Sequence, residues 1–375
     1  MIERHDTLEE LAPEWEALAD GLEAPPFVRP GWIAAWIGAF GRGRTVVLGV
    51  RREDRLVGVV PLLTRRGALY SPTNSHTPAF DLLALDRGAV SELAHGVLAL
   101  GAHRVVLSYL DPDEQAFAAW REAAERRRHR TLAWVTARAP YVSLDGEWTE
   151  YRGSLERKFR KELGRLARRM DDSGRVEFVV DEGSDRWPEL LEEGLRIEGS
   201  GWKTEAGTAI LSRPETARFY RDVAAWAAER GWLRLKFLRL DGRAVAFDLV
   251  LEVGGTAHVL KGGFDPAMRQ LGPGTLLTER SLQRAFELGL HSYELHGTDD
   301  AYKLRWTRTT RARAKTQAFR RSLPGRLAHL AFDHGRPLYR RVRGNEPVER
   351  LGPPDPSGGR PGSSESPTDL VEARK

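Results

Sequence analysis

Apolar residues recur at helical spacing near the start of the chain. Two stripes lie on either side of Pro25-Pro26, the first made of Leu8, Leu11, Trp15 and Leu18 and the second of Trp32, Trp36 and Phe40. Aromatic residues at this spacing most often pack in a core. We therefore predict two helices here, with their tryptophans buried.

A strand pair should follow, since residues 45–50 and 56–63 are rich in branched apolar residues and are separated by the polar run 51–55. Helical spacing then returns over 113–130, and a short strand is expected over 132–136. The turn residues Asp145-Gly146-Glu147 favour a boundary there. We predict a first domain over residues 1–150.

The second half has a clearer pattern. Three strands over 233–239, 245–252 and 256–262 are separated by the turns Asp241-Gly242 and Gly254-Gly255, which is typical of an antiparallel meander. A helix over 275–288, a strand over 292–295 and a further helix after Asp300 are expected next. This order predicts a second domain over 151–322.

The chain should end in a helical extension over 323–351 and a tail over 352–375. The tail is dominated by Gly, Pro and Ser, which bury too little apolar surface to offset chain entropy, so we expect it to be disordered. Residues 152–170 read as a basic amphipathic helix. This helix has either a solvated face over a domain seam or a surface that recognises anions such as CoA, nucleic acid or a lipid headgroup.

Composition narrows the chemistry. The 375 residues include no cysteine, which excludes disulfides, thiolate metal sites and a thiol nucleophile. The 58 basic and 53 acidic residues make the chain mixed in charge rather than polybasic, so the charge balance permits an anionic partner without requiring one. We expect no DNA partner. No metal-ligand constellation, targeting segment or membrane-spanning run stands out, so we expect a cytoplasmic protein without a metal.

One loop has a phosphate-binding pattern. Arg269-Gln270-Leu271-Gly272-Pro273-Gly274 fits Arg/Gln-x-x-Gly-x-Gly/Ala, the pattern by which acyl-CoA enzymes hold a diphosphate. Similar matches begin at Arg196 and Arg239, but only the Arg269 match lies between an expected strand and an expected helix. Free N–H groups and the helix dipole bind a diphosphate at such a place.

The chain resembles a known family over roughly residues 14–310, the GNAT acyltransferases, and within them the CelD/BcsL-like branch, which is related to the FemABX aminoacyl transferases. The resemblance lies in Leu233 to Gly242, Val245-Ala246-Phe247, Gly262 to Pro266, Pro273 to Leu277 and Tyr302 to Trp306. In the first half it lies in Pro26-Phe27, Trp32, Trp36 and Leu56 to Leu62.

The resemblance implies an α/β (α+β) fold of tandem GNAT-like domains with mixed, largely antiparallel sheets. The first domain would be divergent, and the second would hold the acyl donor. It implies an N-acyltransferase of the EC 2.3.1 type that moves an acyl group from acyl-CoA, acetyl-CoA or longer, to an amine on a small molecule, peptide or sugar, in envelope, exopolysaccharide or secondary metabolite synthesis.

The same resemblance assigns roles to residues. The donor would contact the end of a strand, the loop and the start of the next helix, at Gly263, Phe264, Arg269, Gln270, Leu271, Gly272, Gly274 and Thr275. Tyr302 would protonate the departing thiolate, and Lys303 would stabilise an oxyanion or a phosphate. Asp265, Glu294 and His296 are alternative general bases, the last two beside the substrate, and Trp306 is a neighbour of the site.

Three alternatives remain open. An acyl carrier protein would supply the thioester through the same loop. A FemABX-like enzyme would use aminoacyl-tRNA, with the basic helix along its phosphates. A non-catalytic GNAT-fold scaffold in polysaccharide assembly is the third, because a fold does not guarantee a function.

Overall fold

The computed structural model describes residues 1–200, 209–332 and 351. Of the predicted extension over 323–351, residues 323–332 are helical, and residues 333–350 lie outside the described part. The predicted tail over 352–375 also lies outside the described residues.

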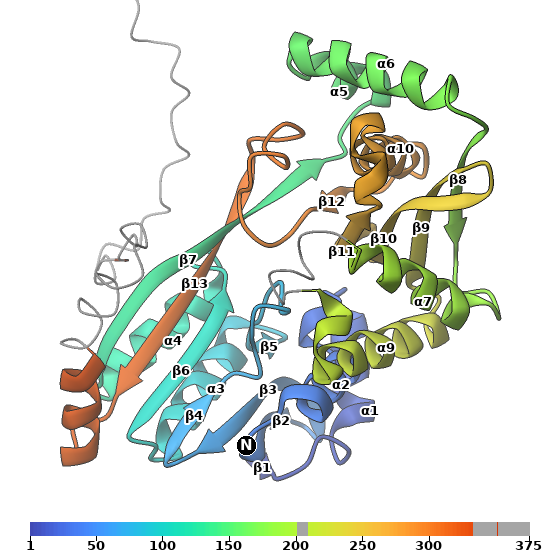
Figure 1. Cartoon of the computed structure of the whole chain (residues 1–375). Coiled ribbons are helices and arrows are strands. Elements are labelled where there is room, and N and C mark those ends of the chain that lie inside the picture. Colours follow the sequence, from blue (N-terminus) through green and yellow to red (C-terminus); the bar gives the residue numbers. More distant parts are fainter. Residues whose placement is uncertain (201–208, 333–350, 352–375) are drawn as a thin grey trace, which may run out of the picture.

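The first part of the chain forms a mixed α/β unit (Figure 1). Its elements are β1 (Ile2–His5), α1 (Ala12–Gly21), η1 (Pro26–Val28), α2 (Pro30–Phe40), β2 (Arg44–Arg52), β3 (Arg55–Arg65), β4 (Ala68–Tyr70), β5 (Leu83–Ala84), α3 (Arg87–Ala99), β6 (Arg104–Leu110), α4 (Gln115–Arg126) and β7 (Arg130–Ser143).

The second part repeats this order after two linking helices. Its elements are α5 (Trp148–Ser154), α6 (Arg157–Asp171), β8 (Val176–Asp181), α7 (Trp187–Glu198), η2 (Ile210–Ser212), α9 (Pro214–Glu229), β9 (Leu233–Leu240), β10 (Arg243–Val253), β11 (Thr256–Phe264), η3 (Pro266–Leu271), α10 (Pro273–Glu287), β12 (Ser292–Glu294) and β13 (Thr310–Phe319).

The strands form one continuous sheet in the order β1-β2-β3-β4-β6-β13-β7-β12-β11-β10-β9-β8, with β5 beside β3. In each half, four strands pair antiparallel in sequence order, and the fourth pairs in parallel with the strand after the next helix: β4 with β6, and β11 with β12. The repeated topology confirms the predicted α/β fold of tandem units with a mixed, largely antiparallel sheet.

Strands β7 and β13 join the two halves. β13 pairs with β6 and β7, and the last residues of β7 pair with β12, so this long ribbon runs diagonally between the halves (Figure 1). β13 falls within the predicted second domain but lies in the ladder of strands from residues 1–150. β13 therefore follows the predicted boundary at residue 150 in the sequence, but in the sheet it pairs with strands that precede this boundary.

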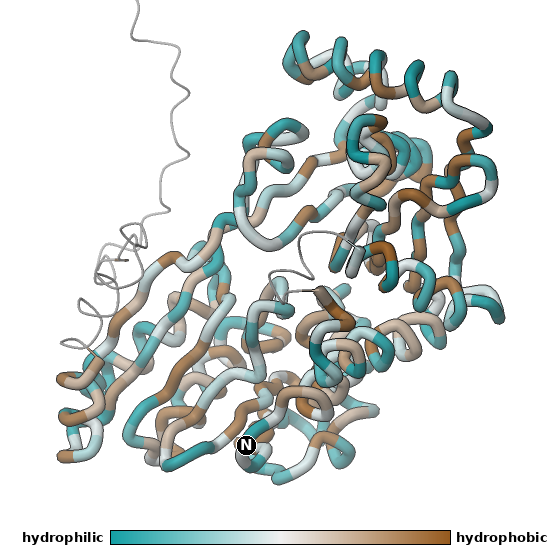
Figure 2. Tube along the Cα trace, viewed as in Figure 1, coloured by the Kyte–Doolittle hydropathy of each residue, from teal (hydrophilic) through white to brown (hydrophobic). Residues whose placement is uncertain are grey.

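The largest apolar cluster lies between the helices of the two halves. Trp15, Trp32 and Trp36 are buried, as predicted, and Trp32 packs edge-on against Phe219 of α9 with ring centroids 5.1 Å apart. Hydrophobic residues are concentrated along the strands and helices of both repeats (Figure 2). This shared core fixes α2 of the first repeat against α9 of the second.

Several predicted elements differ in extent. The basic helix expected over 152–170 is interrupted at Leu155 and Glu156, which separate α5 from α6, and the short strand expected over 132–136 is the 14-residue β7. The helix expected after Asp300 is wrong, because residues 301–306 form only turns. Lys303, which we expected to project toward the reaction centre, is buried within those turns.

Among the described residues, no helix combines the length and the apolar character needed to span a bilayer.

Candidate functional site

The parallel strands β11 and β12 pair over only three residues. Thr256 to His258 lie opposite Ser292 to Glu294, where β12 ends, and β11 continues to Phe264. A register shift against β10 places Leu260 outside the ladder, and such a bulge bends and twists its strand. The far end of β11 therefore extends beyond β12.

The loop after β11 leads into an open helix end. Gly272 adopts φ +64° and is followed at once by Pro273, the first residue of α10. No side chain caps this helix. The first N–H groups of a helix lack intrahelical partners and carry the positive end of its dipole. The start of α10 is therefore suited to an anion such as a diphosphate.

The equivalent helix of the first repeat is different. The carboxylate of Asp86 accepts a hydrogen bond of 2.9 Å from Ala89 N–H at the start of α3, and it pairs with Arg52 at 2.6 Å. A negative charge already occupies this end of the helix. Of the two repeated helices, only α10 presents an uncapped N-terminus to a ligand.

The predicted donor residues surround this helix start. Phe264 and Leu271 pack against the apolar cluster beneath α6 and α10. Exposed residues of the loop are Arg269 and Gln270, and half-buried ones are Gly272, Gly274 and Thr275. Arg269 and Gln270 are therefore available to a ligand, and their contact with a donor stays a prediction.

Two of the glycines also have a packing reason. A Cβ on Gly263 would lie 2.6 Å from Glu198 Cα, and one on Gly272 would lie 2.7 Å from a methyl carbon of Leu166 in α6. Gly263 thus permits close approach of α7, and Gly272 permits close approach of α6, whatever ligand binds. Gly274 is less restricted, because its nearest neighbour is the Phe264 ring at 3.2 Å.

Asp265 has both carboxylate oxygens engaged. It caps η3 by accepting a hydrogen bond of 2.9 Å from Ala267 N–H, and its other oxygen pairs with Arg243. These contacts favour a structural role for Asp265. Its assignment as a general base stays a prediction.

Tyr302 is accessible on the turns that follow β12, with 63% of its surface exposed. Partial desolvation of the phenol, and then the carboxylates of Asp300 and Asp248, raise the pKa of Tyr302 above its usual value. The phenol is therefore protonated at neutral pH, which is the state that a general acid requires.

Lys303 points into the protein. Its ammonium donates to the carbonyl oxygens of His296 at 2.8 Å and Thr298 at 3.0 Å, and it pairs with Asp300 at 3.0 Å. Three partners use the three donors of an ammonium group. In this geometry Lys303 holds the loop after β12 rather than reaching a substrate.

His296 is buried against a second histidine that the sequence reasoning did not single out. His296 Nε2 and His258 Nδ1 are 3.1 Å apart, and the edge of Phe27 from the first repeat packs against both rings. Burial, and then nearby cations, lower the pKa of His258 to about 3, and burial lowers that of His296 as well. Both rings are therefore neutral near pH 7.

The two remaining predicted neighbours are also buried. Glu294 accepts hydrogen bonds of 3.0 Å from Ser292 and from Arg311 of β13 through one oxygen, and its other oxygen has no partner among the described residues. Trp306 packs against Phe159 of α6, with ring centroids 4.8 Å apart. Trp306 therefore packs in the core, and its contact with a substrate stays a prediction.

Sequence reasoning overlooked a charged group inside β10. Asp248 lies opposite Gly262 of β11 and Lys236 of β9, and its carboxylate is near enough to Tyr302 to raise the pKa of that phenol. Lys236 is fully buried and pairs with Glu252 at 3.0 Å. Charged residues within otherwise apolar strands were the available signal.

In the described part of the chain, no group of three or more His, Asp or Glu residues has the geometry to hold a metal ion. The arrangement offers an anion-binding helix end, a strand that extends beyond its parallel partner and a protonated phenol.

Comparison with known proteins agrees with this geometry. Residues 157–304 match the family model described as Acetyltransferase (GNAT) domain. A search of curated proteins found no significant match.

Several solved structures share the fold. One described as the crystal structure of FemX is 14% identical, with a TM-score of 0.55 over 88% of this chain and 99% of that one. The C-terminal domain of a protein described as a lysylphosphatidylglycerol synthetase from Agrobacterium fabrum is 15% identical, with a TM-score of 0.53 over 86% and 95%. A conserved protein of unknown function from Bacteroides thetaiotaomicron is 14% identical, with a TM-score of 0.51 over 85% and 100%.

At these sequence identities, the structural similarity establishes the fold but says nothing about the substrate. The matched segment contains the divergent pair β11 and β12, the uncapped start of α10 and the tyrosine after β12. Residues 157–304 therefore have the GNAT fold and match the family model of the GNAT acetyltransferase domain.

Proposed function

We propose that the chain is an N-acyltransferase that transfers an acyl group from acyl-CoA, or from another acyl thioester, to an amine. The observation that carries the proposal is the uncapped start of α10 behind Gly272, at the end of a strand that outruns its parallel partner. The donor's diphosphate would bind the first-turn N–H groups of α10, near Arg269 and Gln270.

The reaction would proceed by direct attack. The amine nitrogen forms a bond to the thioester carbonyl carbon, and a backbone N–H group of β11 next to the end of β12 would stabilise the oxyanion. The C–S bond then breaks, and Tyr302 protonates the departing thiolate. The proton of the attacking amine passes to a general base. Asp248 is a candidate for this base, in addition to Asp265, Glu294 and His296.

The CelD/BcsL-like branch is part of this proposal, with a small-molecule, peptide or sugar amine as acceptor. An acyl carrier protein would serve the same chemistry with a protein-bound thioester. A non-catalytic scaffold is the opposite outcome, and it would bind no acyl donor.

A second candidate is transfer from aminoacyl-tRNA. Exposed cations of α6 at Arg157, Lys158, Lys161, Arg165 and Arg168 form no salt bridge within the described residues, and similarity of fold to FemX agrees with this candidate. A polyanionic strand would bind such a face with strong salt dependence. The test therefore includes a tRNA arm.

The test is calorimetric titration with acetyl-CoA and a long-chain acyl-CoA. Gly274→Asp places a carboxylate in the first turn of α10, where it stabilises the helix but repels a diphosphate. Gly274→Asn is the matched neutral control. Gly272 is unsuitable, because its φ of +64° and its contact with Leu166 would strain any side chain.

We expect the wild type to bind acyl-CoA and Gly274→Asp to bind about tenfold more weakly or worse, a loss of about 1.4 kcal/mol. Gly274→Asn should stay within about threefold of the wild type, since it adds no charge. If the wild type bound neither acyl-CoA but bound aminoacyl-tRNA, the second candidate would replace the first. Equal binding by all three proteins would remove α10 from the donor site.

A further inference from the structure

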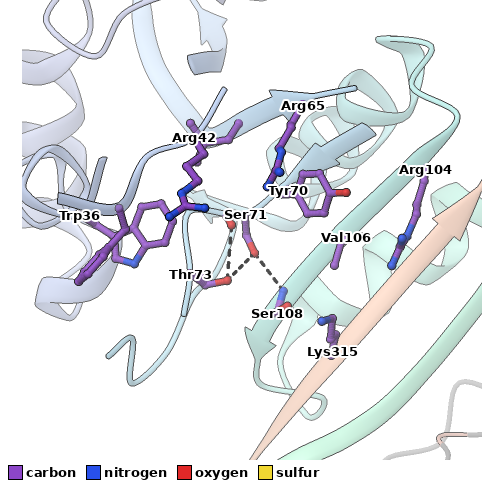
Figure 3. A pocket seen from close by; sticks show the side chains of 12 residues that line it. Trp36, Arg42, Arg65, Tyr70, Ser71, Thr73, Arg104, Val106, Ser108 and Lys315 are labelled. Carbon is purple, nitrogen blue, oxygen red and sulfur yellow. Dashed lines mark hydrogen bonds between the residues drawn. The ribbon is translucent and has the colours of Figure 1, made fainter. Parts of the chain in front are cut away.

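A cavity of about 330 Å³ lies in the first repeat, away from α10. It opens where the parallel pairing of β4 and β6 ends, just after Ser71 N–H donates to the carbonyl of Val106 at 3.0 Å. The strands carrying Arg65, Tyr70, Arg104 and Lys315 and the end of α2 surround the same space (Figure 3).

The lining is strongly cationic. Arg42, Arg65, Arg104 and Lys315 contribute to it, and none of its lining residues is acidic. In residues 1–200, 209–332 and 351, no carboxylate forms a salt bridge with Arg42, Arg65 or Arg104. Arg104 donates only to the side-chain oxygen of Gln317, at 2.9 Å, and its burial lowers the pKa of the guanidinium.

The cations converge from separate elements. Arg42 follows α2, Arg65 is the last residue of β3 and Arg104 is the first residue of β6. Lys315 lies on β13, opposite Ser108 of β6. A solvated charge run on one helix face would not bring four cations around one cavity. Like charges gathered in a partly buried space repel one another unless an anion binds between them.

Hydroxyl groups form the floor of the cavity. Ser71 Oγ accepts a hydrogen bond of 3.0 Å from Ser108 N–H and lies 3.0 Å from Thr73 Oγ1. This fixed arrangement presents polar groups beside the cations (Figure 3). Fixed hydroxyls beside arginines are suited to phosphate oxygens.

The opposite wall is aromatic. Trp36 and Phe40 line this cavity and also a neighbouring one of about 610 Å³, which shares Arg42 and Thr73 with it. The Trp36 indole is 6% exposed, and its N–H has no acceptor among the described residues. A buried donor without a partner is unfavourable, and an acceptor on a ligand would satisfy it.

We propose that this cavity binds a small phosphate-bearing molecule, with a diphosphate among Arg42, Arg65 and Arg104 and a flat group against Trp36 and Phe40. A single carboxylate would leave most of the positive charge unbalanced, and a cavity of 330 Å³ suits a small molecule rather than a polymer. The site is separate from the donor site proposed at α10, because none of the lining residues of the cavity lies in β11, η3 or α10.

The probes are inorganic pyrophosphate, which supplies the phosphates alone, and ADP, which adds a flat ring. Arg42→Gln/Arg65→Gln removes two exposed cations of the cavity. Arg44→Gln/Arg66→Gln is the matched control, since these exposed arginines lie beside the first pair in sequence but line neither cavity. Calorimetric titration at low and high salt measures binding to each protein.

We expect pyrophosphate to bind the wild type, and Arg42→Gln/Arg65→Gln to weaken binding by about tenfold or more. The control should remain within about threefold of the wild type. ADP binding more tightly than pyrophosphate would place its ring on the aromatic wall, and equal affinities would restrict the site to phosphates. No binding of either probe, or equal loss in the control pair, would overturn the proposal.

Acetyl-CoA separates this proposal from the proposed function. A loss of acetyl-CoA binding in Gly274→Asp alone leaves both sites as described. A loss in Arg42→Gln/Arg65→Gln alone would mean that the cavity takes the CoA diphosphate, which supports the cavity and overturns the donor site at α10.

Discussion

Replacing Lys303 by methionine tests whether this lysine holds a loop or stabilises an oxyanion. Methionine keeps most of the apolar stem and removes the ammonium. The carbonyls of His296 and Thr298 would each lose a charge-assisted hydrogen bond. The Lys303 side chain is only 9% exposed, so water could not easily replace these bonds. The primary measurement is therefore the difference in the free energy of unfolding between Lys303→Met and the wild type.

The magnitude follows from these contacts. Two bonds from a charged donor at about 1.5 kcal/mol each give about 3 kcal/mol. The pair with Asp300 adds at most about 0.5 kcal/mol, because the Asp300 side chain is 46% exposed. Apolar packing of the methionine returns a part of this. We expect a destabilisation of about 2–3 kcal/mol.

Urea unfolding followed by tryptophan fluorescence measures this change, with acyl-transfer kinetics on the same preparations. Lys158→Met is the matched control, since Lys158 is exposed on α6, and it should change stability by less than about 0.5 kcal/mol. Our reasoning would be refuted if Lys303→Met kept wild-type stability within about 0.5 kcal/mol while kcat fell by about 100-fold. Lys303 would then act on the substrate directly.

Three further predictions follow from the site. Tyr302→Phe should lower kcat by about 100-fold with an unchanged melting temperature, because the side chain is 63% exposed, and an unchanged kcat would exclude it as the acid. Asp265→Asn should lower the free energy of unfolding by about 1 kcal/mol and keep kcat within about threefold of the wild type. Asp248→Asn should lower kcat by about 100-fold. If steady-state kinetics showed the larger loss of kcat in Asp265→Asn, Asp265 would be the base. Because burial lowers the pKa of His76 to about 4, the folded state disfavours its protonation, so His76 should contribute a loss of stability of about 1.4 kcal/mol per pH unit as the pH falls from about 6.5 to about 4, in addition to the losses from His258 and His296. Urea unfolding at several pH values measures this slope, and a His76→Gln variant with the same slope would contradict the assignment.

Local patterns in the sequence determined much of the second repeat. The strands around Asp241-Gly242 and Gly254-Gly255 form β9, β10 and β11 within two residues of the predicted bounds, and the glycine-rich loop precedes a helix as expected. These features depend on alternation and turn chemistry between residues close in sequence. The same is true of the buried tryptophans of α1 and α2.

Tertiary structure decided the rest, because those contacts join residues far apart in the chain. The place of β13 between β6 and β7 depends on pairings across about 200 residues, which no local pattern encodes. Lys303 and His296 carry the residue types that catalysis would use, yet burial and fixed partners give them structural contacts. The cationic cavity arises only when α2, β3, β6 and β13 meet, since its arginines are scattered among many others in the sequence.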